Sequence, residues 1–219
     1  MLTVVYEDRT CIAVRKPAGM PSQPDPSGDA DALTALSARC GRPLYLVHRL
    51  DRVVGGILLF AKDAAAAARL SESMRERRVE KVYLCVCEGS LPPCGDMKDL
   101  LFHDKRKGKA FVVDRMRGGV KEASLSYRVL ATREAEGKTL CLTEVTLHSG
   151  RFHQIRAQFS HRGTPLVGDG KYGSRVKGAV ALYATRLTFP VEQGTVTVRD
   201  MPNTDTFPWS LFCEECDTI

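Results

Sequence analysis

Short apolar runs rich in β-branched and aromatic residues, separated by turn signals, dominate the hydrophobic pattern of the chain. The runs that predict β-strands span residues 3–7, 11–15, 57–61, 81–87, 110–114, 124–130, 139–147, 179–189 and 195–199. No repeat, low-complexity segment or linker interrupts this series. The pattern predicts one α+β domain over residues 1–219, built around a large, mostly antiparallel mixed sheet that is flanked by helices and loops.

Two stretches have helical rather than strand-like spacing. Asp31 is the expected N-cap of a first helix, which stops at Gly41. Asp63 is the expected N-cap of a second helix over residues 64–78. The residues expected to face inward from these helices are Leu33, Leu36, Cys40, Ala67, Leu70 and Met74.

The charge of the chain is unevenly distributed along its length. The net charge is +6, and residues 48–187 hold 26 Lys and Arg against 15 Asp and Glu, whereas residues 188–219 hold one against six. A positive field over the middle of the chain suits a polyanion such as nucleic acid, and a solvated basic face is the alternative. Composition alone leaves both interpretations open.

The chain has no apolar stretch long enough to span a membrane and no N-terminal pattern of a signal peptide. We therefore expect a cytoplasmic protein without membrane contact. Its eight cysteines are expected to be reduced, mostly as small core residues. Cys213 and Cys216 have metal-ligand spacing, but no second pair completes a zinc site, so a tail turn with two free thiols is expected.

Two polar islands interrupt the strand pattern. The first, "VHRLDRVVGG" at 47–56, places Asp51 among basic residues just before an apolar run, where a carboxylate must be exposed or held by a cation. The second, at 148–173, is expected to form a helix with Phe152, Ile155 and Phe159 on one face and a stop at Gly163. Arg156 would lie near the edge of that face, where an arginine usually needs a carboxylate partner.

The motifs in these islands stand in an order that resembles a known enzyme family. "HRLD" at 48–51, "KVYLCVCEG" at 81–89 and "GRFHQIRAQFSHRGTPLVGDGKYG" at 150–173 resemble the three signature blocks of the RluA-type pseudouridine synthases. The opening strands with their Lys-Pro-x-Gly turn and the late strand "LYATRLTFP" resemble the same family, so the similarity covers nearly the whole chain. The resemblance implies the pseudouridine synthase fold, with a central active-site cleft.

The resemblance also implies a function and a set of site residues. The chain is expected to isomerise uridine to pseudouridine in ribosomal or transfer RNA, as a monomer and without a cofactor or metal. Asp51 corresponds to the catalytic aspartate of the family, acting on the ribose or the base. The implied substrate-binding residues are Arg156, which pairs with this aspartate, Tyr83, which stacks on the uracil, Ile155, which forms an apolar wall, and Arg49, which fills the space of the flipped base.

One departure from the family pattern stands next to the expected catalytic residue. The commoner sequence has a Thr-Ser pair where Val54 and Gly55 stand here, which affects the hydrogen bonds around the site. The chain also begins almost at the first catalytic-domain strand, so the optional RNA-binding S4 domain of the family is not expected. His48 is given no role in proton transfer, because a histidine packed beside a strand is more often structural.

Three further interpretations depend on the same residues. A hairpin over Asp104–Lys121, with seven basic residues, is the expected contact to RNA phosphates, and a solvated hairpin is the alternative. An RNA-binding module or chaperone that keeps the fold without chemistry is the alternative function. A Ser-His-Asp hydrolase is not expected, because the chain lacks a G-x-S-x-G motif.

Overall fold

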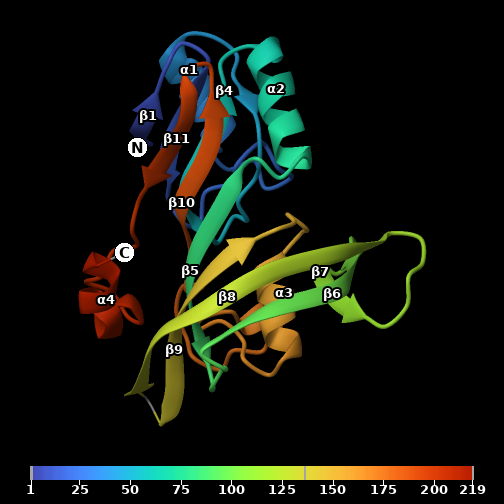
Figure 1. The fold of residues 1–219 in the computed structure, drawn as a ribbon, viewed down its shortest axis with the longest axis vertical. Coiled ribbons are helices and arrows are strands. Elements are labelled where there is room, and N and C mark those ends of the chain that lie inside the picture. The colour runs from blue at the N-terminus through green and yellow to red at the C-terminus, as the bar shows by residue number, and fades with distance from the viewer. Residues whose placement is uncertain (1, 136, 219) are drawn as a thin grey trace. The chain divides into compact units, whose positions relative to one another are not determined.

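The chain folds into two compact units, which the ribbon of Figure 1 traces from blue to red. The computed structural model describes residues 2–135 and 137–218. The first unit comprises Met1–Lys81 and Tyr183–Pro202, and the second comprises Val82–Leu182 and Asn203–Ile219. The single domain over residues 1–219 stays a prediction.

The first unit contains a mixed sheet. Its strands are β1 (Thr3–Glu7), β2 (Cys11–Lys16), β4 (Gly55–Ala61) and β10 (Leu182–Val191) in that order, with β3 (Tyr45–Leu46) paired to β4 and β11 (Gly194–Arg199) paired to β10. β4 and β10 are parallel, whereas the other pairs described in this unit are antiparallel. All seven residues of β4 are buried, which explains its continuous apolar sequence.

The two helices of the first unit have the caps that the sequence predicts. α1 (Ala32–Cys40) begins after Asp31, whose carboxylate accepts a hydrogen bond from the Thr34 backbone N–H, and ends at Gly41 in the left-handed conformation. α2 (Ala64–Arg75) begins after Asp63 in the same way, but it ends three residues before the expected Arg78. Leu70 of α2 is buried in a core cluster with residues of β2, β4, β10 and β11.

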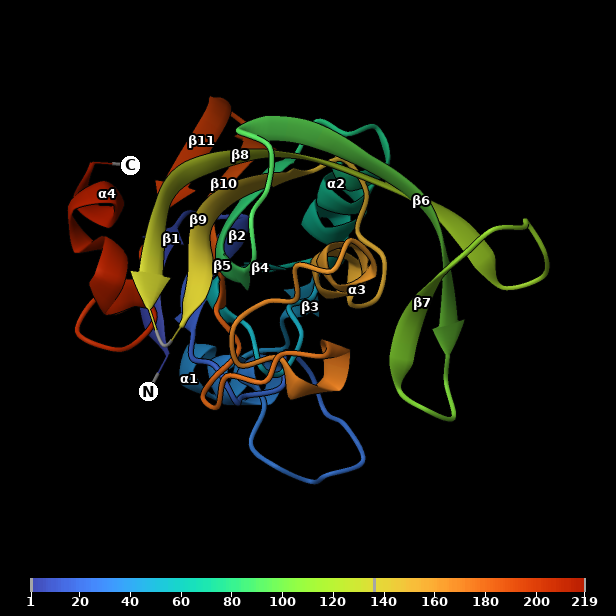
Figure 2. The ribbon, with the colours of Figure 1, turned by 90° about the horizontal axis from the view of Figure 1, so that it is seen from below.

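The second unit contains an antiparallel sheet that curves around one helix. Its strands follow the order β5 (Glu80–Glu88), β9 (Lys138–Leu147), β8 (Val120–Ala135), β6 (Cys94–Asp104) and β7 (Lys109–Val113), with β5 starting at the end of the first unit. Figure 2 shows β6 and β8 arching over α3 (Gln154–His161). The remaining elements of this unit are the short helices η1 (Gly170–Tyr172), η2 (Trp209–Phe212) and α4 (Cys213–Asp217).

The α+β class with mostly antiparallel strands is confirmed, and three details differ from the sequence predictions. β6 was not predicted, because its only buried side chains are Met97 and Leu101, four residues apart. α3 starts at Gln154, so Phe152 precedes the helix instead of lying on its apolar face. The tail forms η2 and α4 rather than a simple turn, with Cys213 exposed and Cys216 buried as free thiols.

Membrane insertion was tested on the helices alone. Among residues 2–135 and 137–218, none of the helices combines the length and the apolar composition that crossing a bilayer requires.

Candidate active site

Asp51 lies in a turn of the first unit, between β3 and β4. The backbone N–H of Val54 donates to the carbonyl of Asp51 at 3.0 Å, which closes the turn. The side chain of Asp51 is partly buried, and it has interaction partners in the structure. The predicted catalytic residue therefore stands on a short, closed segment directly before the fully buried strand β4.

Both neighbours of Asp51 are fixed by the loop that follows β2. The hydroxyl of Ser22 donates to the carbonyl of Leu50 at 2.8 Å and accepts the N–H of Leu50 at 3.1 Å. The N–H of Gly19 donates to the carbonyl of Arg52 at 2.7 Å. Because the backbone on each side of Asp51 is held, the turn is pre-organised before any substrate binds.

Lys16, the last residue of β2, brings a buried positive charge to this turn. Its side chain is fully buried, and its ammonium donates to the carbonyls of Met20 at 2.7 Å, Pro17 at 3.0 Å and Arg52 at 3.3 Å. Burial lowers the pKa of Lys16 to about 8, and the negative charge of Asp51 opposes this shift. Lys16 is thus cationic at neutral pH and interacts electrostatically with Asp51.

Sequence reasoning missed Lys16. The Lys-Pro-x-Gly turn was noted only as part of the family resemblance, and no role was assigned to the lysine. The signal that could have found it is the position of Lys16 in the alternation of β2, where it shares an inward face with the buried Val14 and Ile12. A lysine at such a position requires acceptors, which the following loop supplies.

The departure at Gly55 has a steric explanation. A Cβ atom at Gly55 would lie 2.9 Å from Cε2 of Tyr183, which is its partner in the parallel pairing of β4 and β10. The hydroxyl of Tyr183 donates to Asp200 at 2.5 Å, and Nε of Arg15 donates to the same carboxylate at 2.9 Å. The Tyr183 ring occupies the space in which a serine side chain would begin, so glycine is required at position 55.

The other charged residues of the first island have different environments. Arg49 is exposed, as a residue that enters RNA must be. His48 accepts the N–H of Leu59 through Nε2 at 3.2 Å, and burial lowers its pKa to about 3. His48 is therefore a neutral residue that supports β4, which agrees with giving it no role in proton transfer.

Arg156 belongs to the second unit and is buried on α3. Its guanidinium forms a bidentate pair with Asp169, from Nε to Oδ2 at 2.6 Å and from Nη2 to Oδ1 at 2.8 Å. Its Cζ atom lies 5.0 Å from the centroid of the Tyr172 ring. Arg156 is only 4% exposed, so it lies inside the unit rather than at the edge of an apolar face.

Asp169 is a carboxylate that sequence reasoning missed. The sequence predicted that Arg156 needs such a partner and assigned this role to Asp51, whereas the structure places Asp169 against the guanidinium and 1% exposed. Asp51 and Arg156 lie in different units, and the pair between them stays a prediction. The "GDGKYG" segment was the available signal, because an aspartate between two glycines is set for a backbone that approaches a side chain closely.

Tyr83 and Ile155 also lie in the second unit. Tyr83 is on β5 and 7% exposed, and Ile155 is on α3, directly before Arg156, and equally well buried. Both positions suit residues that line a site for an apolar base face. Their contacts with a uracil ring stay predictions, as does the central cleft.

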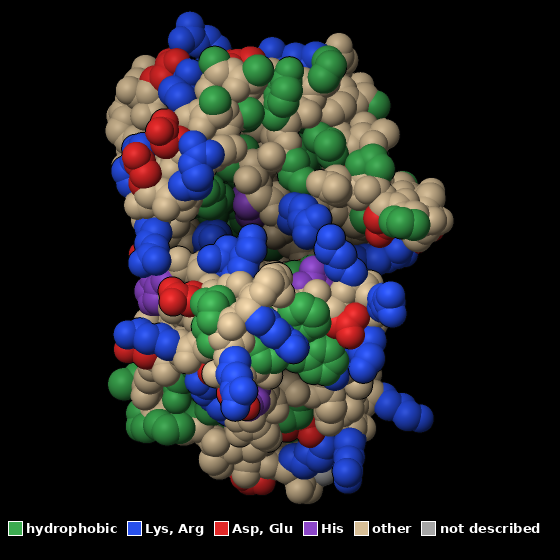
Figure 3. Space-filling view, turned by 90° about the vertical axis from the view of Figure 1, so that its right-hand side faces the viewer, with side chains coloured by type: hydrophobic (Ala, Val, Ile, Leu, Met, Phe, Trp, Pro, Cys, Tyr) green, Lys and Arg blue, Asp and Glu red, His purple; other side chains and the backbone are tan. Residues whose placement is uncertain are grey.

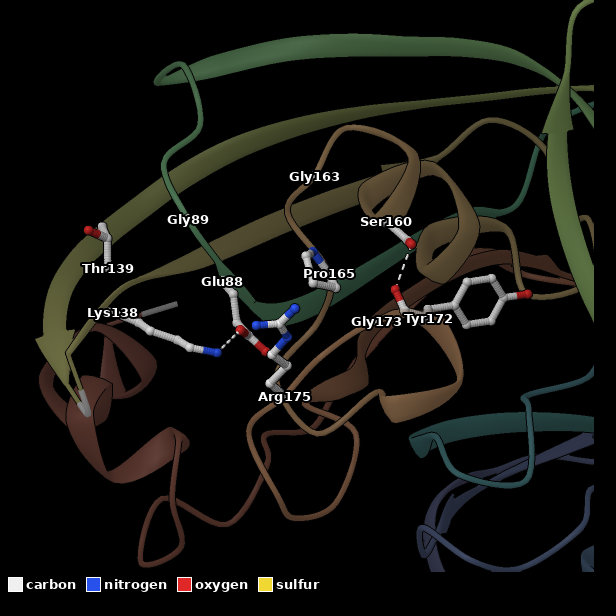
Figure 4. A pocket seen from close by; sticks show the side chains of 10 residues that line it. All are labelled: Glu88, Gly89, Lys138, Thr139, Ser160, Gly163, Pro165, Tyr172, Gly173 and Arg175. Carbon is white, nitrogen blue, oxygen red and sulfur yellow. Dashed lines mark hydrogen bonds and ion pairs between the residues drawn. The ribbon is translucent and has the colours of Figure 1, made fainter.

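A separate cavity of about 570 Å³ lies in the second unit (Figure 4). Glu88, Lys138, Tyr172 and Arg175 are among its lining residues, and the Glu88 carboxylate pairs with Lys138. Within the described part of the chain, the predicted site residues are not part of this lining. The cavity is therefore not the site that the sequence motifs predict.

Comparison with known proteins places the chain among RNA-modifying enzymes. A family model described as RNA pseudouridylate synthase matches residues 10–161. Ribosomal large subunit pseudouridine synthase C of Rickettsia bellii is 32% identical over 175 residues, which cover 78% of this chain and 56% of that protein. tRNA pseudouridine synthase C of Vibrio parahaemolyticus is 30% identical over 185 residues, which cover 78% of this chain and 74% of that protein.

Solved structures share the fold at lower sequence identity. Human RNA pseudouridylate synthase domain containing 1 has a TM-score of 0.78 and 24% identity, over 93% of this chain and 84% of that one. Human RNA pseudouridylate synthase domain containing 4 has a TM-score of 0.76 and 22% identity, over 98% and 93%. The chain spans little more than half the length of several of its curated relatives.

Proposed function

Because this chain belongs to the RNA pseudouridylate synthase family, we propose that it is an RNA pseudouridine synthase, which isomerises specific uridines of structured RNA to pseudouridine. The observation that carries this proposal is the held turn of Asp51 beside the buried ammonium of Lys16. The names of its relatives include ribosomal and transfer RNA enzymes, so both RNA classes are candidate substrates.

The proposed reaction breaks the bond between uracil N1 and ribose C1′ and joins C1′ to uracil C5. The base is detached, turned and reattached, and the proton on C5 is replaced by one on N1, so that the RNA gains and loses no atoms overall. Asp51 acts as the carboxylate that either attacks covalently or stabilises the cationic sugar. It must be ionised for both roles, and a neighbouring cation lowers the free energy of that form.

The remaining residues divide the work of binding. Lys16 supports the ionised form of Asp51 within the first unit. In the second unit Asp169 orients the guanidinium of Arg156, which we propose as a hydrogen-bond donor to Asp51. We further propose that Tyr83 stacks on the uracil and that Ile155 forms the wall beside it.

Extraction of the uridine from its stack requires a replacement and a grip on the backbone. We propose that the exposed Arg49 enters the vacated space, because a planar guanidinium can stack between bases. The Asp104–Lys121 hairpin, formed by β6, β7 and the start of β8, supplies cations for the phosphates. Figure 3, which faces the side to which this hairpin projects, shows Lys and Arg side chains interspersed with apolar ones.

Tritium release tests the proposed reaction directly. Wild-type protein incubated with RNA that carries C5-tritiated uridine should release tritium, since forming the new carbon–carbon bond displaces the C5 hydrogen. Asp51→Asn should release none while binding RNA with wild-type affinity, and Asp205→Asn, at an exposed carboxylate, is the matched control. Binding without release by the wild type, on both ribosomal and transfer RNA, would instead support an RNA-binding module without chemistry.

A further inference from the structure

Three aromatic rings of the second unit are stacked in a row. His103 on β6 and Phe152 have ring centroids 3.9 Å apart at 25°, and Phe152 and His153 have centroids 3.8 Å apart at 18°. Aromatic pairs in protein cores are usually offset or edge-to-face with centroids about 4.5–7 Å apart. The row is therefore more like a stack of bases than a usual core contact.

The inner end of the row is fixed by hydrogen bonds and by the backbone. The Tyr172 hydroxyl accepts the N–H of Ala110 at 2.8 Å and lies 3.0 Å from Nδ1 of His153, so its own hydrogen points to that nitrogen. Burial, helped by nearby cations, lowers the pKa of His153 to about 3, and the ring is neutral. His153 has φ of 52°, a conformation that costs a non-glycine residue about 1–2 kcal/mol.

The outer end of the row lies on the cationic hairpin. His103 and Phe152 are partly exposed, and the part of the chain that the structure describes has no further ring stacked on His103. The ammonium of Lys109 lies 5.4 Å from the centroid of the Phe111 ring and 4.7 Å from that of Tyr172. Cations and aromatic faces thus alternate along this surface, which is the composition of sites for single-stranded nucleic acid.

We propose that His103, backed by Phe152 and His153, is a stacking site for an unpaired RNA base other than the target uridine. The proposal rests on the proposed function, because an enzyme that extracts a base from structured RNA leaves neighbouring bases unpaired. A ring face accepts any base, while Lys107 and Lys109 hold the adjacent phosphates. The row extends to the base that binds, with the three protein rings already ordered.

A structural alternative predicts different variants to fail. If the row only packs the hairpin against the segment before α3, His103→Ala lowers stability and leaves RNA affinity unchanged in the folded protein. If His103 is a stacking site, His103→Ala lowers affinity and His103→Phe restores it. Lys107→Ala is the matched control from the same hairpin, because it removes a cation and leaves the row intact.

The experiment uses RNA stem–loops with 2-aminopurine placed at each loop position in turn, because its fluorescence is quenched on stacking. We expect one position to be quenched by wild type and by His103→Phe, with about 5- to 150-fold weaker binding by His103→Ala. The salt slope should stay at the wild-type value in His103→Ala and fall by about 0.7 in Lys107→Ala. Wild-type quenching by His103→Ala, or equal loss in His103→Ala and His103→Phe, overturns the proposal.

Tritium release by the same wild-type preparation separates this proposal from the enzymatic one. Release together with unchanged quenching in His103→Ala overturns the stacking site alone. Failure to release tritium from any RNA, with quenching that depends on His103, overturns the reaction and retains an RNA-binding surface.

Discussion

Replacing Gly55 with serine tests whether the Tyr183 ring fixes the start of β4 and, with it, the end of the Asp51 turn. The new Cβ would lie 2.9 Å from Cε2 and 3.1 Å from Cδ2 of Tyr183, and 3.4 Å from the backbone nitrogen of Ala18. The Tyr183 ring cannot swing away freely, because its hydroxyl is bonded to the buried Asp200. Overpacking of this kind costs about 1–3 kcal/mol, and losing a hydrogen bond to a charged group costs about 1.5–3 kcal/mol.

We therefore expect Gly55→Ser to lower the free energy of unfolding by about 2–4 kcal/mol, measured by urea denaturation. Gly118→Ser is the matched control, because a Cβ there meets nothing within 4 Å. In a Tyr183→Ala background the ring is absent, and Gly55→Ser should then cost less than about 0.5 kcal/mol. Equal costs in the two backgrounds would show that the ring does not determine the residue at position 55.

Three other perturbations address the buried charges. Lys16→Met should shift the acid limb of the pH–rate profile to higher pH with RNA affinity retained, because Asp51 loses a cation that favours its ionised form; an unmoved limb would exclude this coupling. Asp169→Asn should lower the free energy of unfolding by about 3 kcal/mol in urea, because the buried guanidinium of Arg156 loses its bidentate carboxylate, and a change under 1 kcal/mol would contradict it. The neutral His153, with a folded pKa of about 3 against 6.5, should make stability fall as pH drops below 6.5, by up to about 1.4 kcal/mol per pH unit. His153→Gln should flatten that slope, and an identical slope would assign it to other groups.

Local signals determined most of what could be predicted about the fold. Asp31 and Asp63 each precede an apolar periodicity and accept a hydrogen bond from the first turn, so the helix starts depend on a few neighbouring residues. β6 has no such signal, because Asp96, Lys98 and Asp99 stand among its few apolar positions and its partners β7 and β8 supply the order. Its existence depends on pairing with residues distant in sequence.

The site shows the same division between local and distant information. The motif around Asp51 was evident from the sequence, but the partners of buried charges are chosen by tertiary structure. Asp169 is thirteen residues from Arg156 and reaches it through the turn after α3. Lys16 is 36 residues from Arg52, whose carbonyl it binds. Spacing rules apply within an element and therefore did not identify either contact.

The two buried cations differ in what balances their charge. The guanidinium of Arg156 is already paired with Asp169, so the two together have no net charge, and their contribution is an oriented set of N–H donors. The ammonium of Lys16 is held by neutral carbonyls and keeps a net charge of about +1 at neutral pH, below its pKa of about 8. Within the first unit, the field that keeps Asp51 ionised therefore depends on Lys16. Methylation that preserves the charge and acylation that removes it would accordingly differ in their effect on Asp51, although both remove N–H donors.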